Sequence, residues 1–334
     1  MDLLSLSRRH NHGDTLLASP LLIVPQNLDE MIDWEPVPKC HATVNDAPFT
    51  TFVQARICFE STFNEMMAFV HELDTYTPSA GEELQAAISK YGRIRSQFEK
   101  QSLCLDMLIS RLRGPLSKAD KKAILSIRLI RDQVRIFLKV FNKFGGETGL
   151  LKIGWAIDDE DMETILDLAC QLLGAPTDLL LPDGSVPEDY YTAPADKDLA
   201  SGIKTIPYTP PAFTPCTGLV PAVWLGMSRS TNSSLRRRAI ALLLHYPRRE
   251  GPWDSVLVGR VAWEKMRFEE EALKRSRRQN QIPRVGQKGL VELDWNYVRD
   301  IIIKFPTPRA AQVEFRNVQQ HEAGERGWIK QIVW

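Results

Sequence analysis

The stretch LRRRAIALLLHYPRREGPWDS, residues 235–255, predicts two helices that meet at a proline-bracketed corner. Pro247 ends the first helix, because proline cannot continue the helical hydrogen-bond ladder. Pro252 suits the first turn of the second helix, where its missing N–H leaves no hydrogen bond unmade. Trp253 is expected to fill the corner from the side of the core. We expect the first helix to begin at a cap among residues 232–234.

The side chains at this corner predict a structural lock. Arg248 and Arg249 can donate to the last carbonyls of the preceding helix, and Gly251 can adopt a backbone angle that other residues avoid. Glu250 and Asp254 are expected at the positive N-terminus of the next helix. The residues of this predicted structural signature are Arg236, Arg237, Arg238, Pro247, Arg248, Arg249, Glu250, Gly251, Trp253 and Asp254.

Long amphipathic helices are predicted before the corner. Apolar residues recur at steps of three and four over residues 50–75, 82–112 and 117–144. A shorter helix is expected over residues 159–173, and the helix after the corner continues to about residue 276. Because the connections between the first three helices are short, antiparallel packing is expected.

Near the end of the chain, apolar and polar residues alternate with a period of two. VRDIIIKF at 298–305 and AAQVEFRNV at 310–318 predict a β-hairpin, with GLVEL at 289–293 and GWIKQIVW at 327–334 as further strands. The fold class is therefore mainly α: a multi-helix bundle or array with a small C-terminal β-hairpin or sheet. The predicted units are an irregular lead-in (1–48), a helical half (49–175), a proline-rich linker or long loop (176–217), a second helical half (218–280) and a small β appendage (281–334).

Composition excludes several classes of protein. Lys plus Arg equals Asp plus Glu at 42 each, so no whole-molecule field draws the chain of 334 residues towards nucleic acid or an anionic membrane. The five cysteines are dispersed, which is typical of reduced thiols in the cytosol or nucleus. No apolar stretch is long enough to cross a bilayer. We therefore expect no membrane association.

Sequence motifs predict neither a catalytic site nor a cofactor or metal site. The nucleophile-elbow, zinc-protease, P-loop and dinucleotide-binding patterns are absent from the sequence. Cys216 and His245 could form a nucleophile–base pair, but no motif supports it. The acidic run at 158–161 is interpreted as helix capping and solvated charge rather than as a cation site. The chain is thus not expected to be an enzyme.

Residues 229–278 carry thirteen Lys or Arg against six Asp or Glu, an excess of seven. Such a segment can contact phosphates. The favoured alternative is a solvated face with some arginines paired to Glu269, Glu270 and Glu271, because no aromatic residues interleave the basic runs as a stacking platform needs. A nuclear-import patch is predicted at Lys274, Arg275, Arg277 and Arg278.

Three segments together carry a resemblance: GLVPAVWLGM at 218–227, the run at 235–255, and VGRVAWEKMRFEEEA at 258–272. They resemble the helical regulatory domain that normally follows the binuclear zinc-cluster module of fungal-specific transcription factors. That family pattern has a Gly-Ile-Ile-Pro-Pro-like helix, an RRxAIxLL helix, PRREGLWDS and an acidic EEE run. The chain departs from it at Pro252, where the family prefers a larger apolar residue, and at 228–234, which lacks Cys-Arg-Asp.

The resemblance implies a nuclear transcription regulator, specific to a pathway of (secondary) metabolism. It would act through the transcription machinery or a DNA-binding partner, and as a homodimer. The family's zinc cluster needs six closely spaced cysteines, and no cysteine precedes Cys40. DNA contact is therefore expected to be weak or indirect. The alternatives are a non-DNA-binding helical scaffold or dimerisation protein, with a cytoplasmic location, and an enzyme of unrecognised type.

Overall fold

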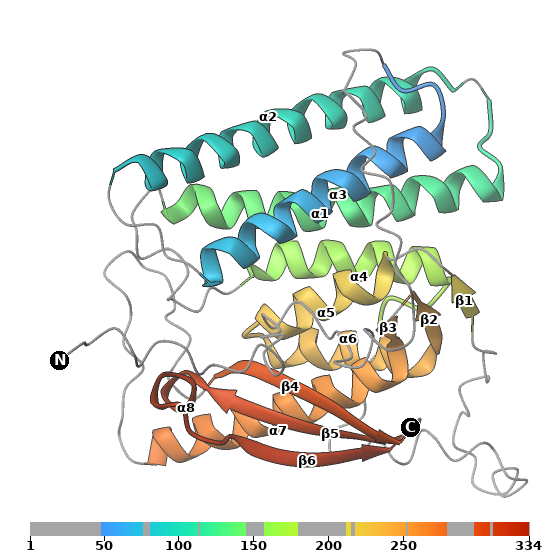
Figure 1. The fold of residues 1–334 in the computed structure, drawn as a ribbon. Coiled ribbons are helices and arrows are strands. Elements are labelled where there is room, and N and C mark those ends of the chain that lie inside the picture. The colour runs from blue at the N-terminus through green and yellow to red at the C-terminus, as the bar shows by residue number, and fades with distance from the viewer. Residues whose placement is uncertain are drawn as a thin grey trace, which may run out of the picture.

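Eight helices and two small sheets make up the described part of the chain (Figure 1). The computed structural model describes residues 48–75, 81–112, 114–144, 157–179, 212–214, 218–251, 253–278, 297–307 and 310–333. The helices are α1 (Phe52–Thr75), α2 (Glu82–Ser110), α3 (Lys118–Phe144), α4 (Asp159–Leu173), α5 (Leu219–Arg229), α6 (Ser233–His245), α7 (Ser255–Arg278) and α8 (Val318–Ala323). The strands are β1 (Ala212–Thr214), β2 (Arg248–Glu250), β3 (Trp253–Asp254), β4 (Val298–Thr307), β5 (Ala310–Asn317) and β6 (Trp328–Val333). The predicted fold class, mainly α with a small C-terminal sheet, is confirmed.

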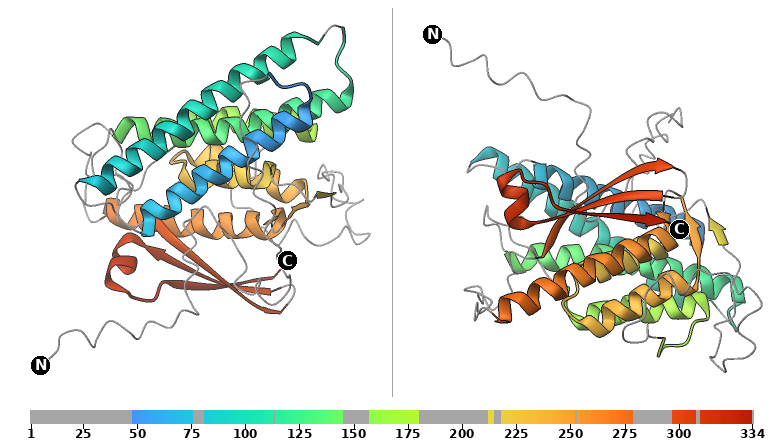
Figure 2. Two further views of the ribbon diagram at one scale, coloured as in Figure 1. Left: turned by 45° about the horizontal axis from the view of Figure 1, so that its top comes forward. Right: turned by 90° about the horizontal axis from the view of Figure 1, so that it is seen from below.

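Helices α1 and α2 form an antiparallel pair, as the short connection predicts. Thr62 donates to Gln101 across the pair at 2.9 Å, and Lys90 lies 2.6 Å from Glu72 further along. The residue numbers rise on α1 while they fall on α2, so the N-terminal end of α1 lies beside the C-terminal end of α2. Figures 1 and 2 place α2 at the outer edge of the molecule, with α1 and α3 beneath it.

Local sequence signals fix several helix ends where they were predicted. Ser117 and Asp120 cap α3 reciprocally: the Asp120 N–H donates to Ser117 Oγ at 3.0 Å, and the Ser117 N–H donates to the Asp120 carboxylate at 3.3 Å. Helix α4 has the predicted bounds, and Gly174 ends it with φ 69°. Helix α3 ends at Phe144, the last residue of the predicted range.

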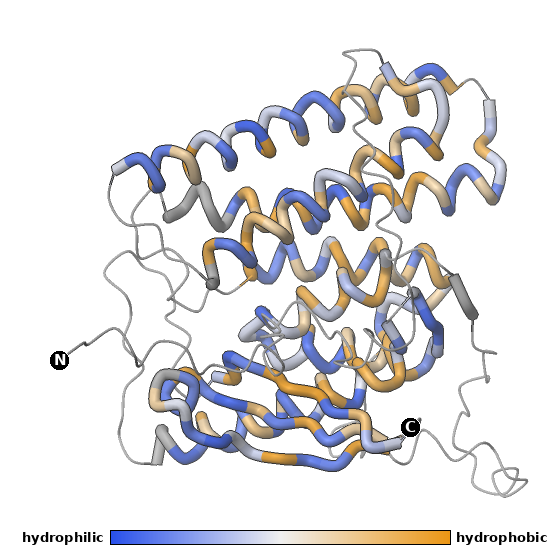
Figure 3. Tube along the Cα trace, in the orientation of Figure 1, coloured by the Kyte–Doolittle hydropathy of each residue, from blue (hydrophilic) through white to orange (hydrophobic). Residues whose placement is uncertain are grey.

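Helix α5 is buried among its neighbouring helices. Its residues from Leu219 to Ser228 are all buried, and it contacts α4, α6 and α7. The buried apolar residues of the two predicted helical halves, such as Phe59 and Trp224, belong to one hydrophobic cluster. Figure 3 shows the alternation of apolar and polar residues along the helices. None of the described helices combines the length and apolarity needed to cross a membrane.

The C-terminal sheet is antiparallel in the order β4-β5-β6, which confirms the predicted hairpin and the strand that follows it. Ile301 pairs with Phe315, and both lie on the buried face. The sheet is fastened to α7, because the ring of Phe268 stacks on Trp328 at 5.6 Å between centroids and Lys330 lies 3.5 Å from Glu264. The strand predicted at 289–293 lies outside the described residues.

A second sheet forms at the corner, and the sequence did not predict it. β2 pairs in parallel with β1, which comes from the proline-rich stretch, and antiparallel with β3. Because Trp253 and Asp254 are extended and paired with β2, helix α7 begins only at Ser255. Pro252 itself lies outside the described residues, and the helix that was expected to begin with it begins at Ser255.

Close packing of α6 against α7 depends on a glycine. A Cβ atom at Gly259 would lie 2.5 Å from Leu244 Cδ2 and 3.2 Å from Leu243 Cβ, whereas one at Gly92 would meet nothing within 4 Å. We expect Gly259→Ala to lower the free energy of unfolding by about 1–3 kcal/mol through overpacking. Gly92→Ala, the matched control within a helix, should raise it by about 0.5–1 kcal/mol. Urea denaturation measures both, and equal effects would contradict this packing argument.

Candidate functional site

The N-terminus of α6 is held by Asn232. Its side-chain oxygen accepts hydrogen bonds from the N–H groups of Ser234 at 3.0 Å and Leu235 at 3.3 Å, so Asn232 is the cap among the three predicted candidates. The amide of Asn232 also donates to Asp159 at 2.9 Å, which joins α6 to the start of α4. These contacts fix the start of α6, the helix that carries the arginine run.

The three consecutive arginines of α6 reach two neighbouring helices, because successive residues of a helix are turned by about 100°. Arg236 reaches Glu269 at 2.6 Å and Arg237 reaches Glu270 at 3.3 Å, both on α7. Arg238 turns the other way to Asp167 of α4, at 2.7 Å. The prediction that some arginines of the basic segment pair with the acidic run of α7 is confirmed.

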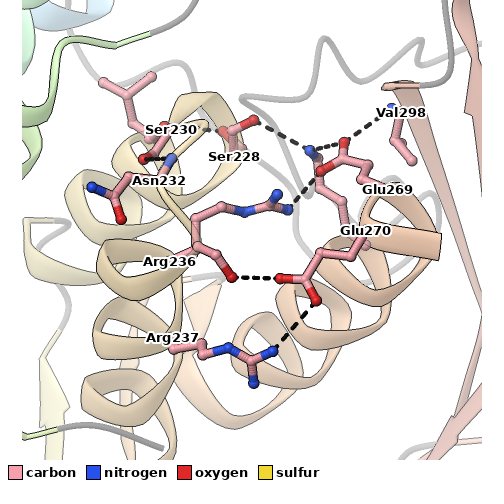
Figure 4. Close-up of polar contacts among 11 residues, drawn as sticks. Ser228, Ser230, Asn232, Arg236, Arg237, Glu269, Glu270 and Val298 are labelled. Carbon is pink, nitrogen blue, oxygen red and sulfur yellow. Dashed lines mark hydrogen bonds and ion pairs between the residues drawn. The ribbon is translucent and has the colours of Figure 1, made fainter. Parts of the chain in front are cut away.

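Glu269 lies at the centre of a buried charge network, formed with Arg236, Lys265, Ser228 and Val298 (Figure 4). Its carboxylate accepts from Arg236 and Lys265, and from the backbone N–H of Val298 at 3.0 Å. Lys265 donates in addition to the carbonyl of Ser228 at 3.2 Å. The network therefore joins α5, α6, α7 and β4 at one point.

Burial and neighbouring charge shift the pKa values of Lys265 and Glu269 in opposite directions. Burial lowers the pKa of Lys265 to about 8, although the neighbouring Glu269 carboxylate raises it. Burial alone would raise the pKa of Glu269, but the cations of Lys265 and Arg236 outweigh it and hold that pKa below its ordinary value. Glu269 is therefore ionised at neutral pH.

The contacts that hold the corner between α6 and α7 differ from the predicted ones. Glu250 accepts from the N–H groups of Gly218 at 3.1 Å and Val220 at 2.9 Å, so it caps α5 and not the helix that follows it in sequence. Arg248 lies 2.7 Å from Glu250, which corrects its expected role at the last carbonyls of α6. Arg249, expected in the same role, is exposed on strand β2.

Three other expectations for the corner are confirmed. Asp254 caps α7 by accepting from the N–H groups of Val256 at 2.9 Å and Leu257 at 3.2 Å. Gly251 has φ 55°, the left-handed region that favours glycine. Trp253 is buried in the core. These contacts explain the corner as structure, without a bound substrate.

The sequence suggested that the acidic start of α4 is solvated, but the structure shows that part of it is buried. Asp161 is buried and accepts from Arg135 at 2.9 Å and Lys139 at 2.8 Å, both on α3. Lys139 also lies 2.6 Å from Asp158, and hydrogen bonds to Asp158 and Asp161 raise the pKa of Lys139. The run therefore fastens α4 to α3.

His245, a candidate for a nucleophile–base pair, lies in the last turn of α6. Its proposed partner Cys216 lies outside the described residues. Among the described residues, no group of three or more His, Cys, Asp or Glu side chains could hold a metal ion. The predicted import patch lies at the end of α7, where Lys274 and Arg275 are exposed.

Burial lowers the pKa of His245 to about 4, below its ordinary 6.5. Between these values the unfolded chain binds a proton that the folded chain does not, so stability should fall as the pH drops below about 6.5. We expect His245 to account for about 1–2 kcal/mol of that loss, allowing for solvent screening. Urea denaturation from about pH 7 to pH 4 should show a flatter profile for His245→Gln, and an unchanged slope would contradict this assignment.

Sequence reasoning missed Lys265, the cation that completes the network. A signal for it exists, because Val258, Val261, Lys265 and Ala272 recur at helical spacing on one stripe of α7, together with Glu269. A lysine and a glutamate four residues apart on an apolar stripe predict a buried pair. Their third partner, Arg236, could not be found from spacing.

Comparison with known proteins identifies a partial relative. No family model matches the chain, and no solved structure matches it. A segment of 64 residues is 44% identical to the aspercryptin biosynthesis cluster-specific transcription regulator atnN of Emericella nidulans. That segment is 19% of this chain and 10% of that regulator, so the match spans about a tenth of the relative's length.

Proposed function

We propose that the chain acts in the nucleus as a pathway-specific regulator of metabolism, through contacts with the transcription machinery or a DNA-binding partner. The similarity to a cluster-specific transcription regulator carries this proposal. The resemblance of residues 218–227, 235–255 and 258–272 to the regulatory domain of fungal transcription factors points the same way.

The charge arrangement favours protein contacts over direct DNA contact. Arg236, Arg237 and Arg238 are each paired with a carboxylate within the protein. A guanidinium in such a pair neutralises a DNA phosphate only after the pair has broken. The loss of that pair then offsets the free energy that counterion release contributes to DNA binding. DNA binding by this chain is therefore expected to be weak.

A tethering experiment tests the regulatory activity. The full chain, fused to an unrelated sequence-specific DNA-binding domain, should change transcription of a reporter that carries the matching sites. The DNA-binding domain alone, at the same protein level, is the control. An unchanged reporter would contradict the proposed regulation of transcription.

A titration tests the expected mode of DNA contact. The purified chain should bind duplex DNA weakly, without sequence preference, and with an affinity that falls as salt rises. Tight, sequence-selective binding at about 0.15 M salt would contradict the proposal that another protein supplies DNA recognition.

Localisation of a fluorescent fusion tests the import patch. Replacing Lys274, Arg275, Arg277 and Arg278 together by Ala should move the protein from the nucleus to the cytoplasm. The control replaces the exposed lysines at the start of α3: Lys118, Lys121 and Lys122. Nuclear accumulation that survives the first change would contradict the assignment of the patch.

A further inference from the structure

Two of the dispersed cysteines come together in the fold. Cys58 lies on α1 and Cys104 on α2. Both are free thiols and half-buried, whereas Cys170, the third cysteine among the described residues, is fully buried on α4. A small oxidant can reach a half-buried thiol, and two thiols that face each other can be joined in a disulfide.

The register of the α1–α2 pair places Cys58 opposite Cys104. Thr62 donates to Gln101 at 2.9 Å, and the side-chain amide of Gln97 donates to Thr62 at 3.0 Å. Cys58 lies one turn before Thr62 on α1, and Cys104 lies about one turn after Gln101 on α2. Because the two helices run antiparallel, one turn back along α1 and one turn forward along α2 lead to the same level of the interface.

The two sulfur atoms also influence each other electrostatically. Burial raises the pKa of the Cys58 thiol, and a negative charge on the Cys104 sulfur raises that pKa further. Such an influence requires the two sulfurs to lie close together, because the Coulomb energy falls with distance.

Helix packing leaves room for a bond between the two sulfurs. Helix axes pack about 8–10 Å apart, and each Cα atom lies about 2.3 Å from its axis. Facing Cα atoms are therefore about 4–5 Å apart at the closest approach of two helices, and farther apart to either side of it. A disulfide spans Cα atoms about 4.4–6.8 Å apart, so the interface of an antiparallel helix pair can hold one.

We propose that Cys58 and Cys104 form an oxidisable pair, which hydrogen peroxide converts to a disulfide that ties α2 to α1. One thiolate attacks a peroxide oxygen, which breaks the O–O bond and gives a sulfenic acid and a hydroxide. The second thiolate attacks the sulfenic sulfur and releases another hydroxide. The two hydroxides take up the protons that the thiols lost, so two thiols and one peroxide give one disulfide and two waters. This inference goes beyond the proposed function and stands independently of it.

The disulfide fastens the outermost helix of the molecule. Helix α2 packs mainly against α1 and lies at the outer edge (Figure 1). It can therefore open locally while the other helices stay folded. A bond between residues 58 and 104 restricts this opening, because it closes a loop through the α1–α2 connection. Amide hydrogen exchange in α2 should be at least about tenfold slower in the oxidised chain than in the reduced chain.

Peptide mapping of the full, natural chain by mass spectrometry tests the pair. The folded protein is treated with hydrogen peroxide, its remaining thiols are blocked with N-ethylmaleimide, and it is digested without reductant. The main product should be a peptide that joins Cys58 to Cys104 and disappears after treatment with dithiothreitol. Recovery of the two cysteines mainly as maleimide adducts, as sulfinic or sulfonic acids, or joined to other cysteines would overturn the proposal.

Cys104→Ser combined with Leu103→Cys is the matched control. It keeps the number of thiols but moves one of them to a 65% exposed position on the outward face of α2. A cysteine there is easier to reach but points away from Cys58, so a disulfide with Cys58 should form at least about tenfold more slowly. Circular dichroism checks that the variant is folded. Equal rates would mean that exposure rather than the helix register governs the oxidation, and would contradict the proposal.

Hydrogen exchange of Cys58→Ser separates the disulfide from other effects of peroxide. This variant keeps a side chain of similar size but cannot form the bond, so peroxide should leave the exchange of α2 unchanged. If peroxide slowed exchange equally in this variant and in the natural chain, or in neither, the disulfide would not fasten α2.

Discussion

Glu269→Gln is expected to lower the free energy of unfolding by about 3–5 kcal/mol, the largest effect we anticipate for a single substitution in the charge network. The change removes the carboxylate that pairs with both Lys265 and Arg236. Two buried cations would then lose the anion that they share. The glutamine oxygen can still accept from the N–H of Val298, so the loss reflects charge rather than shape.

The pH dependence of this loss gives a second test. In the variant Lys265 is expected to fold in its neutral form, because its pKa is already lowered to about 8 when Glu269 is present. Releasing its proton costs less free energy as the pH rises towards the ordinary pKa of lysine. The destabilisation by Glu269→Gln should therefore be smaller at about pH 9 than at about pH 7.

Urea denaturation of matched variants separates the charge effect from simple loss of a glutamate. Glu271→Gln, two residues along α7 with a side chain 60% exposed, should change the stability by less than about 0.5 kcal/mol. Lys265→Met leaves the pair of Arg236 and Glu269 intact and should cost less than Glu269→Gln. If Glu269→Gln were as stable as Glu271→Gln, the network would not have the role described.

Trp224→Ala should destabilise the protein to a similar extent, by about 3–5 kcal/mol. Trp224 is the largest fully buried side chain among the described residues, and it lies on α5, which α4, α6 and α7 surround. Truncation removes the apolar surface of the indole and leaves a cavity that the surrounding helices fill only in part.

Thermal and urea denaturation measure the effect of this substitution. Trp224→Phe, which keeps an aromatic ring at the site, should lose clearly less than Trp224→Ala. Leu103→Ala, at a 65% exposed position, serves as the control and should stay within about 0.5 kcal/mol of the natural chain. A small loss for Trp224→Ala would mean that α5 is not the centre of the core.

Local patterns predicted the elements well. Apolar residues at steps of three and four gave the long helices, and alternation gave the C-terminal hairpin, because burying one face imposes that period on the sequence. The caps at Asn232 and Asp254 were also among the predicted residues, since a cap acts on N–H groups within three positions of itself.

Contacts between distant segments could not be predicted in this way. Strand β1 forms within a proline-rich stretch because β2 offers it a partner. Glu250 caps α5, about 30 residues earlier in the chain, rather than the helix that follows it. The prediction considered only neighbours in the sequence and therefore placed Glu250 at the helix that follows it.

The run at 235–255 by itself determined two helices, the proline that ends the first, the glycine turn and the aspartate cap, because each depends on neighbours in the sequence. Only the tertiary structure decided which carboxylate each of its arginines reaches. Arg236, Arg237 and Arg238 lie within one turn of α6 and reach three carboxylates on α7 and α4. Helix rotation separates them in direction, and the packing of other helices supplies the partner for each.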